Sequence, residues 1–375
     1  MLRTGEIDSM RAWSPADVEF MARALRLARL GLYTAHPNPR VGCVLVRDGR
    51  VVGEGWHRRT GEAHAEINAL ADAGESARGS TAYVTLEPCS HHGKTPPCAE
   101  ALIGAGVRSV VAAMDDPNPK VAGGGIALLR DAGIEVRTGL LGAEAALLNQ
   151  GFVSRVAHGR PFVRLKIAAS LDGRTAMASG ESRWITGKAS RADVQRLRAA
   201  AGAVMTGVGT IAGDDPSLTV RDPAIDTGGR QPVRVVLDSN LRTPPPAKLL
   251  GEDGVTIIYC ARDDGRAALE RAGATVVRFA GQGGRVDPGA VLADLAGRGI
   301  NDVLVESGPT LAGALLSAGL VDELVIYLAP HIMGSETRGM VTTPGWLGLD
   351  QRLELTIGDV RRTGRDLRVT ARPVR

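Results

Sequence analysis

Cysteine and aromatic residues are scarce in this sequence. Among its 375 residues there are four Cys, four Trp, four Tyr and four Phe. So few cysteines in so long a chain exclude a disulfide-stapled secreted scaffold and fit a reducing compartment. The N-terminus lacks the apolar segment of a signal peptide, and no apolar run is long enough to cross a bilayer. We therefore expect a cytoplasmic protein with no membrane partner.

A strong excess of charge of either sign is also missing. The 45 Lys and Arg residues nearly balance the 41 Asp and Glu residues, which leaves a formal net charge of +4. Binding of nucleic acid calls for basic stripes and stacking aromatic residues, and the sequence has neither. We expect a small-molecule partner and no nucleic acid. The length itself predicts two domains.

The first half alternates between helical and strand patterns. Ser14 is an expected N-cap, with Pro15 at the first helical position and Asp17 in the first turn. Asp48-Gly49 is a hairpin turn between two apolar runs. This alternation predicts an α/β domain at 14–150 with a mixed sheet. The expected helices are 15–30, 63–73, 98–104 and 124–132, and the expected strands are 41–46, 51–55, 81–86, 107–113 and 134–136.

The pattern breaks near 143–160 and then restarts, which predicts a second α/β domain at 160–375. The expected strands are 162–168, 203–207, 233–238, 255–260, 274–279, 303–306 and 324–328, and the expected helices are 191–200, 266–272 and 291–297.

One set of His, Glu and Cys residues has the composition of a catalytic metal site. His64-Ala65-Glu66 is followed by Pro88-Cys89 and, after eight more residues, by Cys98. An H-x-E element followed by Pro-Cys and a second Cys is typical of zinc-dependent base deaminases, although their usual spacing between the cysteines is two residues. One imidazole and two thiolates supply three ligands of a tetrahedral Zn²⁺ and leave a fourth position for water, which the metal acidifies. Glu66 is the predicted proton carrier for hydrolytic deamination.

Three other interpretations of this constellation stay open. Cys89 and Cys98 could form a disulfide, or His91 or His92 could complete a purely structural zinc site. A nucleic-acid base deaminase is the third, but the C-terminal half lacks the features that bind nucleic acid.

The second half contains an apparent dinucleotide fingerprint. Gly207-Val208-Gly209-Thr210-Ile211-Ala212 follows an expected strand and fits G-x-G-x-x-A. A true fingerprint opens a helix whose N-terminus binds the pyrophosphate. Gly213-Asp214-Asp215-Pro216 comes next and should break a helix, so we do not expect a Rossmann domain here.

The motifs together resemble the bifunctional deaminase–reductase family of riboflavin biosynthesis, and the likeness covers nearly the whole chain after Trp13. The long cysteine spacing is typical of that family. The matching segments are 37–42, 53–57, 64–66, 86–98, 116–119, 170–174, 182–187, 207–210, 214–221 and 306–313.

The resemblance implies a fold and two reactions. The N-terminal domain would be a cytidine-deaminase-like three-layer α/β domain, and the C-terminal domain would be dihydrofolate-reductase-like. A zinc-dependent step would deaminate 2,5-diamino-6-ribosylamino-4(3H)-pyrimidinone 5′-phosphate, and NADPH would then reduce the ribosyl group to ribityl. The family also suggests a homo-oligomer, either a dimer or a tetramer.

The resemblance also implies site residues. His64, Cys89 and Cys98 would bind zinc, with Glu66 catalytic, and the glycines at 123–125 with Asn118 suggest a mobile lid. Arg198 and Arg221 suit a dianionic phosphate, because guanidinium binds it bidentately. Asn38, His57 and Lys94 are polar side chains on the matched segments and are our candidates for binding the deaminase substrate, although a plain Asn turn and a solvated loop are the alternatives for Asn38 and Lys94. The positions that the resemblance implies for the reductase substrate are Ser182, Arg198, Leu218, Arg221 and Glu306. Positions implied for NADPH are Ala168, Trp184, Thr210, Asp214, Ser239 and the loop Gly308, Pro309, Thr310, Leu311, Ala312, Gly313 and Ala314.

Overall fold

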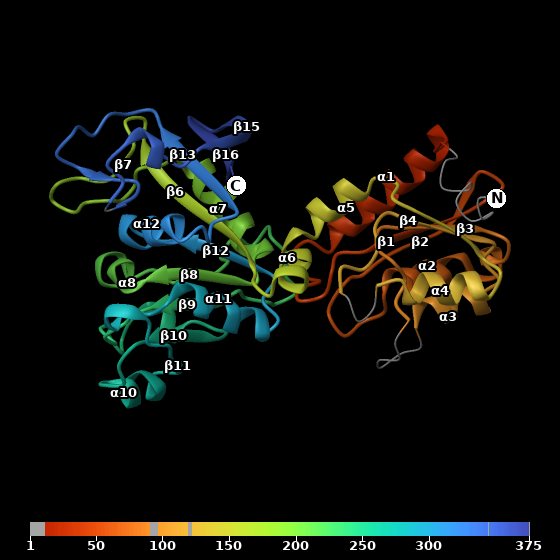
Figure 1. The fold of residues 1–375 in the computed structure, drawn as a ribbon, viewed down its shortest axis with the longest axis horizontal. Coiled ribbons are helices and arrows are strands. Elements are labelled where there is room, and N and C mark those ends of the chain that lie inside the picture. Colours follow the sequence, from red (N-terminus) through yellow and green to blue (C-terminus); the bar gives the residue numbers. More distant parts are fainter. Residues whose placement is uncertain (1–11, 91–96, 119–121, 344, 375) are drawn as a thin grey trace. The chain divides into compact units, whose positions relative to one another are not determined.

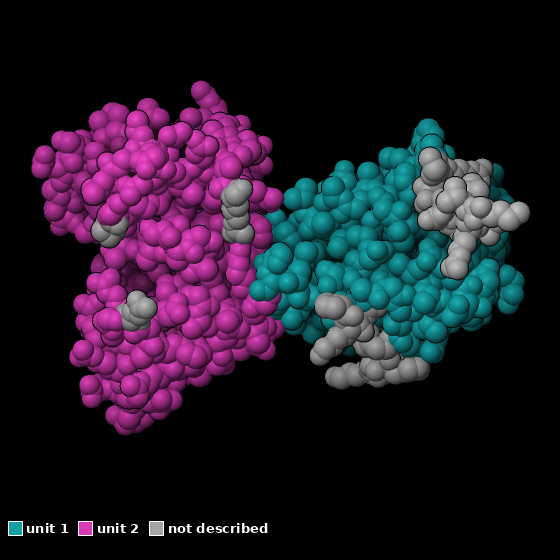
Figure 2. Space-filling view, in the orientation of Figure 1, with its two compact units in different colours: residues 1–158 teal, residues 159–375 magenta. Residues whose placement is uncertain are grey.

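The computed structural model describes residues 12–90, 97–118, 122–343 and 345–374 (Figure 1). The chain divides into two compact units, Met1–His158 and Gly159–Arg375, which Figure 2 draws in different colours. Each unit has its own large sheet and its own core. No helix within the described ranges is long and apolar enough to span a membrane.

The first unit is built around a five-stranded sheet in the order β2-β1-β3-β4-β5. β1 pairs antiparallel with β2 and β3, whereas β3, β4 and β5 are parallel. The mixed sheet expected from the sequence is therefore confirmed. Its elements are α1 (Pro15–Leu30), β1 (Gly42–Arg47), β2 (Arg50–Trp56), α2 (Ala65–Ala73), a 3-10 turn (Gly74–Ala77), β3 (Thr81–Val84), α3 (Cys98–Gly104), β4 (Ser109–Ala112), α4 (Gly124–Asp131), β5 (Glu135–Thr138), α5 (Gly142–Leu148) and α6 (Gln150–His158).

Helices cover both faces of this sheet. One face packs Met21 and Leu25 of α1 and Ala145 of α5 against the strands. The other face packs the small residues of α2 together with Leu102 of α3 and Leu129 of α4. This gives the expected three-layer α/β arrangement, in which each helix buries one apolar stripe.

The second unit contains a nine-stranded sheet in the order β11-β10-β9-β8-β12-β6-β13-β16-β15. The run from β11 to β13 is parallel, and β16 is antiparallel to both of its neighbours. The strands are β6 (Phe162–Ser170), β7 (Arg174–Ala176), β8 (Ala203–Gly207), β9 (Val233–Leu237), β10 (Thr256–Cys260), β11 (Ala274–Arg278), β12 (Asp302–Glu306), β13 (Glu323–Ala329), β14 (Arg338–Gly339), β15 (Leu355–Thr363) and β16 (Asp366–Pro373). The helices are α7 (Lys188–Ala200), α8 (Val208–Asp214), α9 (Lys248–Gly251), α10 (Arg266–Arg271), α11 (Pro288–Gly297) and α12 (Pro309–Ser317), with 3-10 turns at Gln282–Gly284 and Leu349–Gln351.

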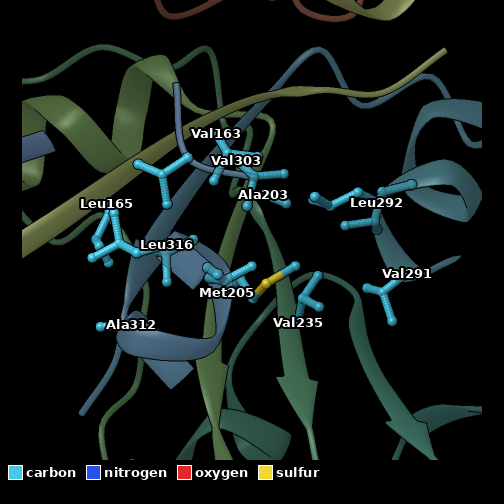
Figure 3. Packing of buried hydrophobic residues seen from close by; sticks show 14 of the residues in the cluster. Val163, Leu165, Ala203, Met205, Val235, Val291, Leu292, Val303, Ala312 and Leu316 are labelled. Carbon is cyan, nitrogen blue, oxygen red and sulfur yellow. The ribbon is translucent and has the colours of Figure 1, made fainter. Parts of the chain in front are cut away.

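The core of this unit lies between the central strands and two helices. In Figure 3, Val291 and Leu292 of α11 and Ala312 and Leu316 of α12 lie beside the side chains of the strands. The labelled strand residues are apolar and buried, as is typical of parallel strands covered by helices.

Four parts of the chain differ from the sequence-based expectation. The predicted break at 143–160 is mostly helical, because α5 and α6 fill it. A short helix, α8, does follow β8, contrary to our expectation, but it ends at Asp214, within the segment that was expected to break a helix. The expected loop at 308–314 is the N-terminal part of α12 with Gly308 as its N-cap. The hairpin of β15 and β16 was not predicted.

Candidate active sites

His64 is positioned by the start of α2. It is the N-cap residue of that helix, its backbone is extended, and its side chain makes no capping hydrogen bond. The helix approaches β2 so closely that a Cβ on Gly55 would overlap the backbone of Ala65 and Ala69. A glycine at this strand position therefore lets the first turn of α2 carry His64 and Glu66 against the sheet.

The three expected zinc ligands lie together. Cys98 begins α3, and Cys89 lies in the loop after β3. The Nδ1 atom of His64 is 3.3 Å from Cys98 Sγ and 3.7 Å from Cys89 Sγ, and all three ligand atoms lie within 4.8 Å of one another. Zn²⁺ bound tetrahedrally, at about 2.0 Å from nitrogen and about 2.3 Å from sulfur, would hold these atoms roughly 3.5 Å apart. The donor set therefore fits zinc in type and in spacing.

The surroundings of Cys89 also suit metal binding. Hydrogen bonds from the Cys98 thiol, His64 and the Cys98 backbone N–H lower the pKa of Cys89 to about 4, although burial opposes this. The hydrogen bond to Cys89 and burial raise the pKa of Cys98. The lowered pKa favours the thiolate form of Cys89, and thiolate is the form that binds a metal, whereas Cys98 loses its proton when a metal binds. All four cysteines are free thiols, so the structure contains no Cys89–Cys98 disulfide.

Glu66 lies in the first turn of α2, next to this cluster. Its residue is only 3% exposed. Burial raises the pKa of Glu66 to about 7, and its backbone contact and His64 reduce the shift only in part. A carboxyl group whose pKa lies near neutral pH can both accept and return a proton, which is the property a general acid–base needs.

Asn38 and His57, both expected at the substrate, contact each other. The Nδ2 atom of Asn38 is 3.0 Å from Nε2 of His57, and Nδ1 of His57 is 3.2 Å from the Ala63 carbonyl oxygen. A carbonyl can only accept, so Nδ1 carries the proton and Nε2 accepts from the Asn38 amide. This orients the amide of Asn38 with its oxygen turned away from His57. Lys94, His91 and His92 lie outside the described residues.

The reductase-type residues gather at one edge of the second sheet. Ala168 is near the end of β6, Glu306 ends β12, Gly207 ends β8, and Ser239 follows β9. These four strands are consecutive and parallel. Their carboxyl ends therefore lie at the same edge, where ligands of open α/β sheets usually bind.

Three charged side chains form a buried cluster at this edge. Arg198 donates from Nε to Glu306 Oε1 at 2.6 Å, from Nη2 to Oε2 at 3.1 Å, and from Nη1 to the Thr219 carbonyl oxygen at 2.9 Å. Lys166 Nζ is 3.7 Å from the same carboxylate. Burial alone would raise the pKa of Glu306, but Arg198 and Lys166 lower it to about 2. Arg198 is thus paired with Glu306, and Arg221 is the exposed member of the two expected arginines.

A second group joins an expected substrate residue to an expected cofactor residue. Ser182 donates its hydroxyl proton to Asp214 Oδ1 at 3.1 Å, and Asp214 is the last residue of α8, which also carries Thr210.

The remaining expected residues lie in different surroundings. Trp184 is 69% exposed, with the Arg191 guanidinium 4.6 Å from its ring centroid. Leu218 is buried and has a positive φ of 56°. Ser239 accepts a hydrogen bond from the Val286 backbone at 3.0 Å.

The segment 308–314 begins α12 directly after β12. No side chain caps this helix, so no side chain competes for the backbone N–H groups of its first turn. A Cβ on Gly313 would overlap the backbone of Thr342, which shows how closely the helix packs there. A bare helix start beside a strand end suits a phosphate-containing cofactor.

Sequence reasoning missed two charged residues in these sites. Lys166 lies in β6 between the buried residues Leu165 and Ile167, and a lysine inside such a strand is itself a signal, because lysine is rarely buried without a partner. Glu87 stands in the matched segment 86–98 but received no role, and nothing local indicates which groups its carboxylate would meet. Of the glycines at 123–125, Gly123 is the N-cap of α4 and the other two begin the helix.

Two family models match this chain. Residues 14–114 match the "Cytidine and deoxycytidylate deaminase zinc-binding region", and residues 161–369 match the "RibD C-terminal domain". The zinc-binding match covers His64, Glu66, Cys89 and Cys98.

Proteins of known identity match nearly the whole chain. Riboflavin biosynthesis protein RibD of Escherichia coli K12 is 49% identical over 360 residues, which is 94% of this chain and 98% of the relative. The protein of the same name from Haemophilus influenzae is 45% identical and covers 97% of this chain and 99% of its own.

Solved structures of related proteins share this fold. RibD of Acinetobacter baumannii superposes with a TM-score of 0.91 at 45% identity, over 96% of this chain and 99% of the other. A Thermotoga maritima structure, described as a diaminohydroxyphosphoribosylaminopyrimidine deaminase/5-amino-6-(5-phosphoribosylamino)uracil reductase, has a TM-score of 0.83 at 35% identity over the same shares. The fold expected for both domains is confirmed.

Proposed function

This chain belongs to the RibD family of bifunctional deaminase–reductases of riboflavin biosynthesis. On that premise we propose that each of its two units catalyses one of the two reactions. The domain at 14–150 hydrolyses the exocyclic amine of 2,5-diamino-6-ribosylamino-4(3H)-pyrimidinone 5′-phosphate. The domain at 160–375 then reduces the ribosyl group to ribityl with NADPH. The deaminase assignment rests on one observation: His64, Cys89 and Cys98 lie together beside the buried Glu66.

In the deaminase unit, His64, Cys89 and Cys98 would hold Zn²⁺, which supplies Lewis acidity toward the attacking water. Glu66 takes a proton from that water and delivers it to the amine as the C–N bond breaks, so the carboxyl group ends the cycle as it began. The amide oxygen of Asn38, held by His57, accepts a hydrogen bond from the pyrimidine. Lys94 completes the set of substrate residues carried over from the family.

In the reductase unit, the cofactor would lie along the carboxyl edge of β9, β8, β12 and β6. Its residues are Ala168, Trp184, Thr210, Asp214, Ser239 and 308–314, and the substrate residues are Ser182, Arg198, Leu218, Arg221 and Glu306. Hydride transfer needs the nicotinamide and the sugar carbon to be close and aligned, and it needs no protein nucleophile. Arg221 is exposed and is the cation we assign to the phosphate. Arg198 acts by holding Glu306 in place.

A coupled assay tests this division. Purified protein receives the diaminopyrimidinone ribosyl phosphate and NADPH, and ammonia and the absorbance at 340 nm are followed together with the zinc content. We expect ammonia release first, then NADPH oxidation, with about one zinc per chain. The Glu66→Gln variant should keep its zinc and its reductase activity on the deaminated substrate but release no ammonia. Deamination by this variant at close to the wild-type rate would contradict the role of Glu66.

We further propose that the protein is a homo-oligomer, a dimer or a tetramer, and that two copies of β15 contact each other. β15 is the outermost strand of the nine-stranded sheet, and one of its edges has no neighbouring strand in that sheet. Leu355, Ile357 and Val360 expose 40%, 62% and 56% of their surface. An exposed, partly apolar edge strand is a template for pairing, and two identical edges can pair about a twofold axis. Ile357→Lys should reduce the mass measured by light scattering, and an unchanged mass would refute this contact.

A further inference from the structure

Glu87 is a buried carboxylate two residues before Cys89, and only 4% of its surface is exposed. Four backbone N–H groups donate to it. Oε2 accepts from Asp116 at 3.1 Å and Gly123 at 3.0 Å, and Oε1 accepts from Gly125 at 3.0 Å and Ile126 at 3.2 Å. These donors belong to the segment between β4 and α4 and to the start of α4 itself. One side chain therefore joins the loop after β3 to the loop after β4.

We propose that Glu87 is a positioning residue of the deaminase site, which fixes Pro88 and Cys89 relative to Asp116 and the first turn of α4. The proposal rests on the function proposed above, because it gives Cys89 its role as a metal ligand. Glu87 does not touch the ligand atoms. It acts through the backbone on both sides of them.

The packing around Glu87 makes this connection rigid. The Glu87 backbone N–H donates to the Met114 carbonyl oxygen at 2.9 Å, which links the ends of β3 and β4. A Cβ on Gly125 would overlap the carbonyl oxygen of Pro88, the residue between Glu87 and Cys89. The start of α4 therefore lies directly on the Cys89 loop. No side chain caps α4 locally, so Glu87 provides the cap from a distant part of the sequence.

The same carboxylate orders the segment that contains Asn118. Asp116, whose N–H donates to Glu87, accepts through Oδ1 from the Asn118 N–H at 2.8 Å. The glycines expected to form a mobile lid are thus held by charge-assisted hydrogen bonds, which are about twice as strong as neutral ones. The pattern of four donors around one group also explains the residue type. Only an ionised carboxylate offers two acceptor oxygens, whereas glutamine would turn its NH₂ group toward two N–H donors.

The first test is amide hydrogen exchange, resolved by residue, on the full chain without metal or substrate. In Glu87→Gln, two of the four amides of Asp116, Gly123, Gly125 and Ile126 should exchange about 10- to 100-fold faster than in the wild type, as expected for the loss of hydrogen bonds to a charged group. Glu75→Gln is the matched control, because Glu75 is an exposed residue of the same unit. Its exchange should match the wild type. Unchanged exchange of all four amides in Glu87→Gln would overturn the proposal.

The second test measures Zn²⁺ affinity by competition with a chelator. Outer partners of metal ligands typically contribute 10- to 100-fold to metal affinity or activity, so we expect Glu87→Gln to bind Zn²⁺ about 10- to 100-fold more weakly. Reductase turnover of the deaminated substrate should be unchanged and reports that the second unit is folded, and wild-type exchange of the β1 and β3 amides reports that the first unit is folded. If exchange accelerates but Zn²⁺ affinity stays within twofold of the wild type, Glu87 is merely structural and the proposal fails.

A second variant and the independence of both measurements from turnover keep the tests decisive. If Glu87→Gln does not fold, Glu87→Asp keeps the charge but shortens the side chain, and the same two measurements apply with the same criteria. If the wild-type protein binds Zn²⁺ but releases no ammonia, the proposed deamination is wrong. Hydrogen exchange and Zn²⁺ affinity still decide the role of Glu87 in that case, because neither depends on turnover.

Discussion

Removing the charge of Glu306 should destabilise the reductase unit strongly. Its side chain is 11% exposed, and it is the shared anion of Arg198 and Lys166, whose side chains are 9% and 18% exposed. In Glu306→Gln these two cations stay close together without a counter-charge, a change that typically costs about 3–5 kcal/mol. The pKa of Glu306 gives a similar figure. A decrease from 4.5 to about 2 corresponds to about 3 kcal/mol, at about 1.36 kcal/mol per pKa unit.

The sign of the pH dependence follows from the lowered pKa. Stabilisation by Glu306 is complete above its unfolded-state pKa of 4.5 and is lost as the pH falls toward the folded-state value of about 2. The free-energy difference between wild type and Glu306→Gln should therefore be about 3 kcal/mol at pH 7. It should shrink steadily below pH 4.5 as the wild-type carboxylate becomes protonated.

Urea unfolding of the full chain measures this difference, with hydrogen exchange of the β6 and β12 amides marking the transition of the second unit. Glu354→Gln is the matched control in the same unit, because the Arg352–Glu354 pair is 59% exposed on both sides. Exposed pairs contribute at most about 1 kcal/mol. A Glu306→Gln effect no larger than that of the control, or one that does not change between pH 5 and pH 2.5, would refute the reasoning about the buried cluster.

Three other changes give separable results. Cys98→Ala should lose zinc by metal analysis and abolish ammonia release, while NADPH oxidation with the deaminated substrate continues; retention of stoichiometric zinc would argue against this ligand. Arg221→Ala should raise the reductase KM and spare deamination, and an unchanged KM would remove it from the phosphate site. Asn149→Ala should destabilise the first unit by about 2–4 kcal/mol in thermal unfolding, because buried Asn149 pairs with both the N–H and the carbonyl of Arg40; a change below about 0.5 kcal/mol would contradict this.

Local signals in the sequence predicted many elements well. The Ser14 capping box, with Pro15 and Asp17, starts α1 as expected, and Gly31 follows its last residue. Asp48-Gly49 forms the turn of the β1–β2 hairpin, with Asp48 and Gly49 both at positive φ. Such features depend on residues within a few positions of one another, so their physical cause is visible in the sequence.

Other elements depend on partners that are distant in the chain. β16 was not predicted, although Leu367, Val369 and Ala371 alternate with polar residues in it, and its pairing with β13 on one side and β15 on the other supplies its strand hydrogen bonds. The helix α8 forms although Gly213 and Asp214 disfavour it, because Val208 and Ile211 are buried in the unit. Tertiary packing overrides weak local propensity at such places.

The sequence by itself determined the chemistry that this protein can perform. His64, Glu66, Cys89 and Cys98 identify a zinc-dependent deaminase site, because few residue types bind this metal and their spacing along the chain is distinctive. The tertiary structure alone decided how charges and hydrogen bonds are distributed around the sites. Arg198 pairs with Glu306 across 108 positions, and Glu87 meets amides up to 39 positions away. A buried charge is stabilised by whichever groups the fold brings to it, and a one-dimensional pattern does not contain those distances.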